Sequence, residues 1–277
     1  MAESKPTFTL YVIFHKFLVP ECYETLSEKD LKDHVRMVGV NGKIPKLVPP
    51  PLEPLVIYER DLPWYNPFLQ LNRFCETSVF YHAWKNPELF LRNNTYIGFL
   101  HYDMLLKREA IEFLEREIPA AEARGEQVLF THVCLPARDH IYQVFALEGW
   151  NAILSIYNAI FGKNHTVHTI IDKEIPLYHT YVMHRDLFQR MMFFADHAIG
   201  RLFELLNYNT RHLPYFIERL HGVFLRLCRE DGISPTWMTV PGIIHQERLK
   251  DDWQNSGAVT GATTNNGDAT AGAAKPV

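Results

Sequence analysis

The feature that most constrains this chain is an alternation of short strand-like runs with longer helical periods. The runs are rich in β-branched and aromatic residues, and amphipathic patterns lie between them. Strands separated by helices form βαβ units, in which a largely parallel sheet is covered on both faces. The sequence therefore predicts an α/β fold with a doubly wound mixed sheet flanked by helices. The expected strands are 8–14, 55–58, 96–100, 128–133 and 177–183.

Apolar residues three or four positions apart indicate helices between these strands, because that spacing places side chains on one helix face. Each such face is expected to pack against the sheet or against another helix. The faces are formed by Phe68, Leu71, Cys75 and Val79; by Ile111, Leu114, Ile118 and Ala121; by Phe188, Met191, Ala195, Ile199, Leu202 and Leu206; and by Phe216, Leu220, Val223 and Leu227.

The chain is predicted to form one domain over residues 1–253, followed by a disordered tail over 254–277. An apolar share of 47% and a charged share of 22% are ordinary for a globular protein, which excludes a fibrous or mostly disordered chain. The tail consists mainly of Gly, Ala, Thr and Asn. It has too few large apolar residues to offset the entropy lost on ordering.

Charge and cysteine usage narrow the classes of function. A net charge of -4 argues against binding of nucleic acid through bulk electrostatics. No apolar run approaches the ~20 residues that span a bilayer, and the start of the chain does not read as a secretory signal. The four cysteines form no C-x-x-C pair, which favours free thiols in a reducing compartment. We therefore expect a soluble protein of the cytoplasm, which is the host cytoplasm if the source is a virus.

Residues that follow the strands are the first candidates for chemistry, because ligands of such folds bind beyond the carboxyl ends of the strands. His15 and Lys16 follow the first expected strand, and His101, Tyr102 and Asp103 follow the third. An acid at this place can hold Mg²⁺ or Mn²⁺ while phosphate oxygens fill other coordination positions. The alternative is that Asp103 caps a helix that starts near residue 107.

A second acid, Glu218, lies early in the helix predicted over the last apolar face. Pro214 suits the first turn of that helix, and the residues around Glu218 are apolar. The acid can face a ligand pocket there. The alternative is a structural salt bridge to a neighbour such as Arg219 or Arg211, which is the commoner role of a paired carboxylate.

The chain has fourteen histidines, so metal ligation needs to be weighed. His165 and His168 form an H-x-x-H, but it lies in a polar stretch without a cysteine partner, and there is no H-E-x-x-H. A dedicated zinc site is therefore not expected. A lone histidine can complete a Mn²⁺ site, and His245 is the candidate, since it follows an apolar run near the end of the body. The alternative is an ordinary hydrogen-bonded side chain.

Two neighbouring segments resemble a known family. Residues 75–86, Cys-Glu-Thr-Ser-Val-Phe-Tyr-His-Ala-Trp-Lys-Asn, resemble the pattern C-E-L-T-x-x-Y-W-x-W-K-N, and 96–102 resemble the start of Y-I-G-x-x-H-Y-R-R-Y. Residues 12–16, 181–188 and 216–220 resemble its V-x-T-H-K, M-F-I-M-K-K-E-x-F and F-I-S-E-R-L segments in the same order. The family comprises bacterial and viral glycosyltransferase-like domains and is similar to the GT-A glycosyltransferases.

This resemblance implies a GT-A-like (Rossmann-like) fold and an inverting glycosyltransferase that uses Mn²⁺ or Mg²⁺. Asp103 would match the second acid of the D-x-D metal element, with His101 in the place of the first acid. His245 would match a late metal-binding histidine. Glu218 would match the catalytic acid at a helix start, which removes a proton from the acceptor hydroxyl. Residues 103 and 104 depart from the family's usual arginine pair.

The resemblance also implies a nucleotide-sugar donor, for which a UDP-sugar carrying a hexose or xylose is expected, and a glycan acceptor. No nucleic-acid partner is expected, and the oligomeric state is open. The alternative is a catalytically inactive protein on the same fold that binds a nucleotide-sugar or a glycan. The residues expected around donor or acceptor are Phe14, His15, Lys16, Val38, Gly39, Arg73, Glu76, His101, Tyr102, Tyr178, His179 and Thr180.

Overall fold

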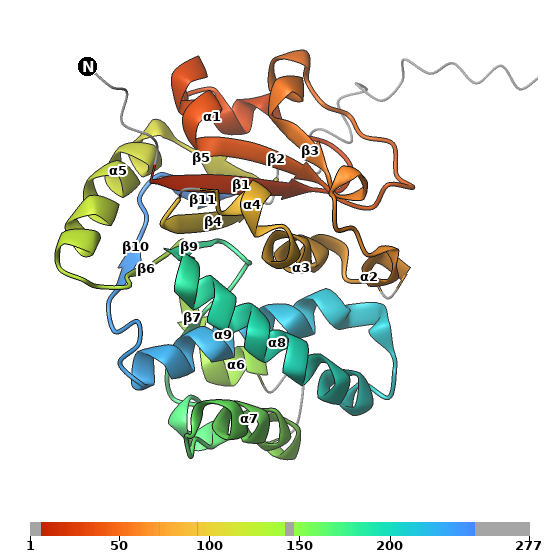
Figure 1. Cartoon of the computed structure of the whole chain (residues 1–277), viewed down its shortest axis with the longest axis vertical. Helices are drawn as coiled ribbons and strands as arrows, with labels where there is room; N and C mark the ends of the chain where they lie inside the picture. The colour runs from red at the N-terminus through yellow and green to blue at the C-terminus, as the bar shows by residue number, and fades with distance from the viewer. Residues whose placement is uncertain (1–6, 72, 93, 142–146, 247–277) are drawn as a thin grey trace, which may run out of the picture.

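A computed structural model describes residues 7–71, 73–92, 94–141 and 147–246. Strands and helices alternate along this part of the chain (Figure 1). The strands are β1 (Phe8–Phe14), β2 (Val35–Gly39), β3 (Val56–Tyr58), β4 (Tyr96–His101), β5 (Met104–Leu106), β6 (Leu129–Thr131), β7 (Cys134–Pro136), β8 (Glu174–Pro176), β9 (Tyr181–His184), β10 (Trp237–Thr239) and β11 (Ile243–His245). The α-helices are α1 (Glu28–His34), α2 (Pro67–Leu71), α3 (Ser78–Lys85), α4 (Pro87–Phe90), α5 (Arg108–Ala123), α6 (Ala137–Ile141), α7 (Leu147–Phe161), α8 (Arg185–Leu205) and α9 (Leu213–Glu230).

Within the described residues, one seven-stranded sheet organises the molecule in the order β10-β6-β9-β4-β1-β2-β3. Strand β1 pairs in parallel with β2 and β4, and β2 pairs in parallel with β3. Strand β9 is antiparallel to both of its neighbours, β4 and β6. The sheet is therefore mixed, as predicted. All seven residues of β1 are buried, as expected for a central strand covered on both faces.

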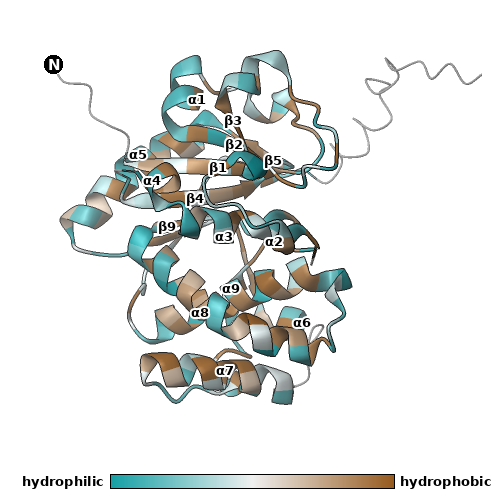
Figure 2. Cartoon of the chain, turned by 45° about the vertical axis from the view of Figure 1, so that its right-hand side comes forward, coloured by the Kyte–Doolittle hydropathy of each residue, from teal (hydrophilic) through white to brown (hydrophobic). Residues whose placement is uncertain are grey.

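The hydrophobic core lies on both faces of this sheet. One cluster joins Tyr11 and Ile13 of β1 to helices α3, α7, α8 and α9. The other joins Leu10 and Val12 of β1 to α5 and the segment after β1. Successive side chains of a strand point to opposite faces, so β1 contributes to both clusters. Figure 2 shows hydrophobic and hydrophilic segments alternating along α8 and α9, as amphipathic helices require.

Several predicted elements are confirmed. Strands form within or close to each of the five expected ranges. The face of Ile111, Leu114, Ile118 and Ala121 is buried on α5, and the two later faces form α8 and α9. Strand β2, at 35–39, was not among the predicted strands. The predicted tail over 254–277 lies outside the described residues.

Two predicted elements are wrong in detail. The single helical face expected from Phe68 to Val79 does not form. The helix is interrupted between α2 and α3, where Arg73 and Cys75 have φ of 61° and 50°. Phe68 is consequently 58% exposed. The strand expected over 177–183 starts only at Tyr181, since the two residues at 178 and 179 form a left-handed turn.

No helix among the residues described by the structure has the length and the apolar character that a membrane crossing requires.

Candidate active site

A cavity of about 450 Å³ opens at the carboxyl ends of β1 and β4. Its size is that of a small-molecule site. Segments far apart in the sequence contribute to its wall, namely the ends of β1, β4 and β11, the turn before β9 and the start of α9. The lining residues are His15, Cys75, Glu76, His101, Tyr102, Asp103, His140, Leu177, Tyr178, His179, Arg211, Pro214, Tyr215, Glu218, Arg219 and His245.

One wall of the cavity is formed by the ring of His15 and the carboxylate of Glu76, which are in contact. The Nδ1 atom of His15 lies 2.9 Å from Oε1 of Glu76, and the carboxylate is 17% exposed. Burial alone would raise the pKa of Glu76, but the interactions with His15 and His101 outweigh burial and lower it to about 2. Glu76 is therefore ionised at neutral pH, and its carboxylate lies against the ring of His15.

A second wall carries Asp103, which is 2% exposed. Its Oδ2 atom lies 3.4 Å from Nε2 of His245. The pairing of β5 with β11 brings the two residues together, because His245 lies opposite Met104, and the ring of Tyr178 stacks on His245. Asp103 does not cap α5, whose N-cap residue is Lys107. A carboxylate beside an imidazole at a cavity wall is a donor set that suits Mn²⁺.

The third residue expected to bind metal, His101, does not join this pair. Among the residues described by the structure, no group of three or more His, Cys, Asp or Glu side chains can hold a metal ion. The protein thus offers two side chains, Asp103 and His245, and a bound cation would complete its shell with phosphate oxygens and water.

Glu218 faces the cavity from the second turn of α9. Its Oε1 accepts a hydrogen bond from the backbone N–H of Tyr178, and its Oε2 accepts one from Arg219 at 2.9 Å. The salt bridge weighed as a structural alternative is therefore formed, while the carboxylate also lines the cavity. Glu218 thus forms the salt bridge to Arg219 and lines the cavity at the same time.

The backbone that Glu218 holds is strained. Tyr178 has a φ of 63° and His179 a φ of 46°, both in the left-handed region that favours glycine. Two successive non-glycine residues in this region cost free energy, and such strain clusters at functional sites. The turn directs Tyr178 and His179 to the cavity, while the hydroxyl of Thr180 donates to the carbonyl of Tyr178.

A group of buried histidines extends from the cavity into the core. The rings of His179 and His221 are 5.2 Å apart, and those of His101 and His179 are 6.2 Å apart. Burial and the two neighbouring histidines keep the pKa of His179 well below its ordinary value, and burial lowers that of His221 to about 3. Within the described part of the chain, Nε2 of each ring is buried without a hydrogen-bond partner. His101 and His179 therefore offer the cavity ring nitrogens that a ligand hydroxyl can satisfy.

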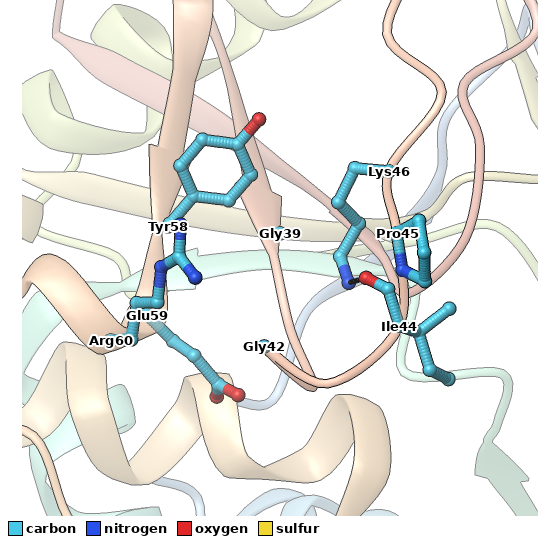
Figure 3. A pocket seen from close by; sticks show the side chains of 8 residues that line it. All are labelled: Gly39, Gly42, Ile44, Pro45, Lys46, Tyr58, Glu59 and Arg60. Carbon is cyan, nitrogen blue, oxygen red and sulfur yellow. Dashed lines mark hydrogen bonds between the residues drawn. The ribbon is translucent and has the colours of Figure 1, made fainter.

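A smaller cavity of about 230 Å³ lies at the ends of β2 and β3 (Figure 3). Gly39, one of the residues expected near the nucleotide, lines it together with Tyr58. The ammonium of Lys46 donates to the carbonyls of Asn41 and Ile44, which fixes the loop on one side. The lining residues are Gly39, Gly42, Ile44, Pro45, Lys46, Tyr58, Glu59 and Arg60.

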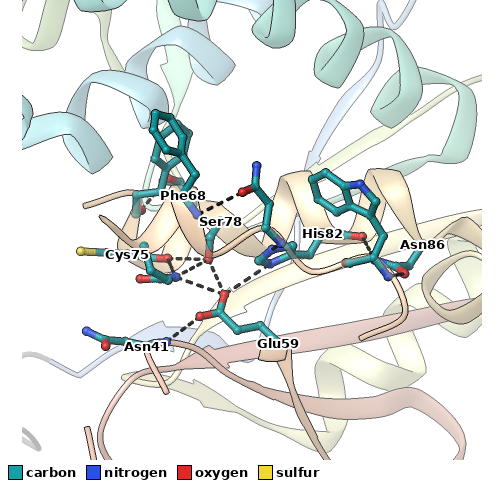
Figure 4. Close-up of polar contacts among 12 residues, drawn as sticks. Asn41, Glu59, Phe68, Cys75, Ser78, His82 and Asn86 are labelled. Carbon is teal, nitrogen blue, oxygen red and sulfur yellow. Dashed lines mark hydrogen bonds and ion pairs between the residues drawn. The ribbon is translucent and has the colours of Figure 1, made fainter. Parts of the chain in front are cut away.

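A buried carboxylate, Glu59, lines the smaller cavity and is the centre of a network of polar contacts (Figure 4). It accepts hydrogen bonds from the backbone N–H of Asn41 at 2.7 Å, from the hydroxyl of Ser78 at 2.7 Å and from the side chain of Gln70 at 3.1 Å. Nδ1 of His82 lies 3.3 Å from the same carboxylate, while its Nε2 accepts from a backbone N–H. His82 therefore carries its proton on Nδ1.

The structure brings most of the predicted site residues to the large cavity and leaves others elsewhere. The side chains of Phe14 and Val38 are fully buried in the core, and Thr180 is fully buried behind the strained turn. Lys16 and Arg73 are exposed and do not line the cavity. Those that line it are Glu218, His15, Glu76, His101, Tyr102, Tyr178, His179, Asp103 and His245.

Other lining residues were not predicted from the sequence. Arg219 was weighed only as a partner of Glu218, and its position one residue further along the same helix was the signal for it. His140 and Tyr215 also line the cavity. Burial, and next the charge of Arg219, lower the pKa of His140. Nothing in the local sequence of His140 indicates a ligand, since only the tertiary fold brings α6 to α9.

No protein-family model matches the sequence, and no curated protein matches it. Solved structures resemble the fold. The chain aligns with "WbbM bifunctional glycosytransferase apo structure" over 85% of its own residues and 45% of that chain, with a TM-score of 0.56 and 15% identity. The fold is GT-A-like. The chain spans less than half the length of that protein.

A second structure is core-mannan synthase A (CmsA/Ktr4) from Aspergillus fumigatus in its Mn/GDP form. The alignment covers 88% of this chain and 75% of that chain, with 11% identity and a TM-score of 0.35. A TM-score this low does not establish a shared fold.

Proposed function

We propose that this protein is an inverting glycosyltransferase that moves a sugar from a nucleotide-sugar, expected to be a UDP-sugar carrying a hexose or xylose, to a hydroxyl of a glycan acceptor. One observation carries the proposal. Asp103, between β4 and β5, and Glu218, on the distant helix α9, line the same cavity at the carboxyl ends of the parallel strands. The GT-A-like fold and the resemblance of the sequence motifs agree with it.

Glu218 is assigned the role of general base. Each of its oxygens already accepts one hydrogen bond, from Tyr178 or from Arg219, and a carboxylate has about four acceptor positions in all. An acceptor hydroxyl can therefore still bind. As its oxygen attacks the anomeric carbon, Glu218 takes the proton, and the bond to the diphosphate breaks on the opposite face of the sugar. An α-linked donor then gives a β-linked product.

A divalent cation fits the pair formed by Asp103 and His245. Bound there, Mn²⁺ or Mg²⁺ would neutralise charge on the departing nucleoside diphosphate. His15 is held by Glu76, and its Nε2 is left to contact the donor. We expect the base of the nucleotide to lie near Gly39, at the smaller cavity.

The test begins with a thermal-shift screen of nucleotide-sugars with and without Mn²⁺, because a true donor stabilises the fold by mass action. With the donor found, Glu218→Gln should keep donor binding and lower turnover by about 10²- to 10⁴-fold. Glutamine retains an oxygen for the amide of Tyr178, so the fold should persist. Glu204→Gln, a half-exposed carboxylate of α8, is the matched control and should behave as the wild type. Unchanged turnover in Glu218→Gln would remove the base assignment.

The stereochemistry gives an independent check. The anomeric configuration of the product, measured by NMR, should be opposite to that of the donor. A product that retains the donor's configuration would contradict inversion, whatever the effect of Glu218→Gln.

A second candidate is a nucleotide-sugar or glycan-binding protein on the same fold without catalysis. The salt bridge of Glu218 to Arg219 favours it, because it gives the carboxylate a structural role. Donor binding by the wild type without turnover against a panel of glycan acceptors would support this candidate.

A further inference from the structure

A third cavity, of about 260 Å³, lies away from the candidate active site. It is placed over the first halves of β1 and β2, whereas the active-site cavity begins where β1 and β4 end. Helices α1 and α4 contribute its rim. The lining residues are Thr9, Tyr11, Lys32, Asp33, Arg36, Ile57, Leu89, Arg92 and Asn94.

Two guanidinium groups dominate the charge of this cavity. Arg36 and Arg92 form no ion pair with a carboxylate in the described parts of the chain. Lys32 adds a third positive charge, and the carboxylate of Asp33 is already paired with Lys29. The lining therefore has an excess of positive charge.

The two arginines are held in place by backbone carbonyls. Nη1 of Arg36 donates to the carbonyl oxygens of Lys32 at 2.8 Å and Val35 at 2.6 Å, and Nε of Arg92 donates to Leu89 at 3.2 Å. Each guanidinium has five N–H donors, so most remain for a ligand. Arg36 and Arg92 line the same cavity, where their like charges repel, and burial, and next the charge of Arg92, lower the pKa of Arg36. An anion between them would relieve that repulsion.

The floor of the cavity is polar and fixed. Nδ2 of Asn94 donates to the hydroxyl of Thr9 at 2.6 Å, and both residues are less than 10% exposed. The hydroxyl of Tyr11 donates to the carbonyl of Phe90 at 2.7 Å. These contacts join β1 to α4 and to the loop before β4. The backbone that carries Arg92 is therefore fixed relative to β1.

The backbone of Arg92 gives a further reason to ask what the side chain does. Arg92 follows α4 with a φ of 43°, a left-handed position at a helix end where glycine is favoured. A long charged side chain there costs free energy that glycine would avoid.

We propose that this cavity binds the phosphate group of a small phosphorylated ligand through Arg36 and Arg92. Guanidinium forks match the oxygens of a phosphate and bind them in pairs. A dianion also suits the excess positive charge of the lining. This site does not depend on the proposed glycosyltransferase function, since it shares no residue with the active-site cavity.

The test uses the full chain and inorganic phosphate, with binding measured by calorimetry for the wild type and for variants of this cavity. The variants are Arg92→Gly, which should fold at least as well because it relieves the left-handed backbone, and Arg36→Gln. Each should weaken phosphate binding by about tenfold or more, since hydrogen bonds to charged groups are the strong ones. Arg116→Gln, an exposed arginine of α5, is the matched control and should bind as the wild type.

Glucose 6-phosphate distinguishes the sources of the phosphate group. Tighter binding than inorganic phosphate supports a sugar phosphate that also contacts Ile57 and Leu89, and equal binding supports recognition of the phosphate alone. The proposal is overturned if the wild type binds neither probe. It is also overturned if Arg92→Gly and Arg36→Gln bind phosphate as the wild type does.

Discussion

Nδ1 of His15, at the end of β1, lies 2.9 Å from Oε1 of Glu76, which enters the cavity from the segment before α3. The two residues belong to separate sequence motifs that the fold brings together. The buried carboxylate orients the ring, and the ring keeps the carboxylate ionised. Glu76 is therefore a positioning residue for His15, and its replacement should be visible in stability as well as in activity.

We predict that Glu76→Gln lowers the free energy of unfolding at pH 7 by about 3 kcal/mol. The pKa of Glu76 falls from its ordinary value of 4.5 to about 2, and one pKa unit corresponds to about 1.4 kcal/mol. Because the folded-state pKa is lowered, this stabilisation is complete above about pH 4.5 and is lost as the pH falls towards 2. Urea unfolding of both proteins should show the gap between them narrowing over that range.

The control for this experiment is Glu112→Gln, whose carboxylate is 59% exposed and forms a surface pair with Arg108. It should change stability by less than about 0.5 kcal/mol. A gap between the wild type and Glu76→Gln that stays constant from pH 7 to pH 3 would contradict the linkage.

The proposed metal site at Asp103 and His245 gives a second prediction. Asp103→Asn and His245→Gln should each weaken Mn²⁺ binding by about tenfold or more, since each removes one of the two proposed protein ligands. His101→Gln should leave it nearly unchanged, because His101 does not join the pair. Mn²⁺ titrations followed by electron paramagnetic resonance, in the presence of UDP, measure this. Equal losses in all three variants would show that His101 is a ligand as well.

The sequence predicts the helices and the mixed sheet well where burial is regular. Ile111, Leu114 and Ile118 repeat at helical spacing, and all three are buried on α5. The prediction fails where the backbone adopts a left-handed conformation without glycine. Arg73 has this conformation between the short helices α2 and α3, and Tyr178 has it just before β9 begins. No residue type marks either position, and at Tyr178 the backbone N–H is held by Glu218 of the distant helix α9.

The same limit applies to the site. Residues that follow strands, such as His15 and Asp103, could be predicted because strand ends meet at one edge of a sheet. His140 could not, since only the packing of α6 near α9 brings it to the cavity. The strained turn at Tyr178 could not be predicted from the sequence either, although its residues were expected near the ligand.

The buried carboxylate of Glu59 should be a main source of stability for the region beside the cavity at the ends of β2 and β3. Glu59→Ala should cost about 3–5 kcal/mol, because it removes the buried acceptor shared by the backbone N–H of Asn41, the hydroxyl of Ser78 and the side chain of Gln70. Glu53→Ala, an exposed carboxylate on the preceding segment, should cost less than about 0.5 kcal/mol. Chemical denaturation of the two variants makes the comparison. Similar small losses would mean that the network around Glu59 is not energetically important.

Two glycines in neighbouring helices should respond to alanine in opposite directions. A Cβ at Gly222 of α9 would lie 2.6 Å from the carbonyl oxygen of Pro176, so Gly222→Ala should destabilise the fold by about 1–3 kcal/mol as α9 is pushed from β8. A Cβ at Gly200 of α8 meets no atom within 4 Å. Gly200→Ala should therefore stabilise the protein by about 0.5–1 kcal/mol through helix propensity. Thermal unfolding of both variants tests the packing of α9 that sets the position of Glu218. Equal shifts in the same direction would contradict the close approach of α9 to β8.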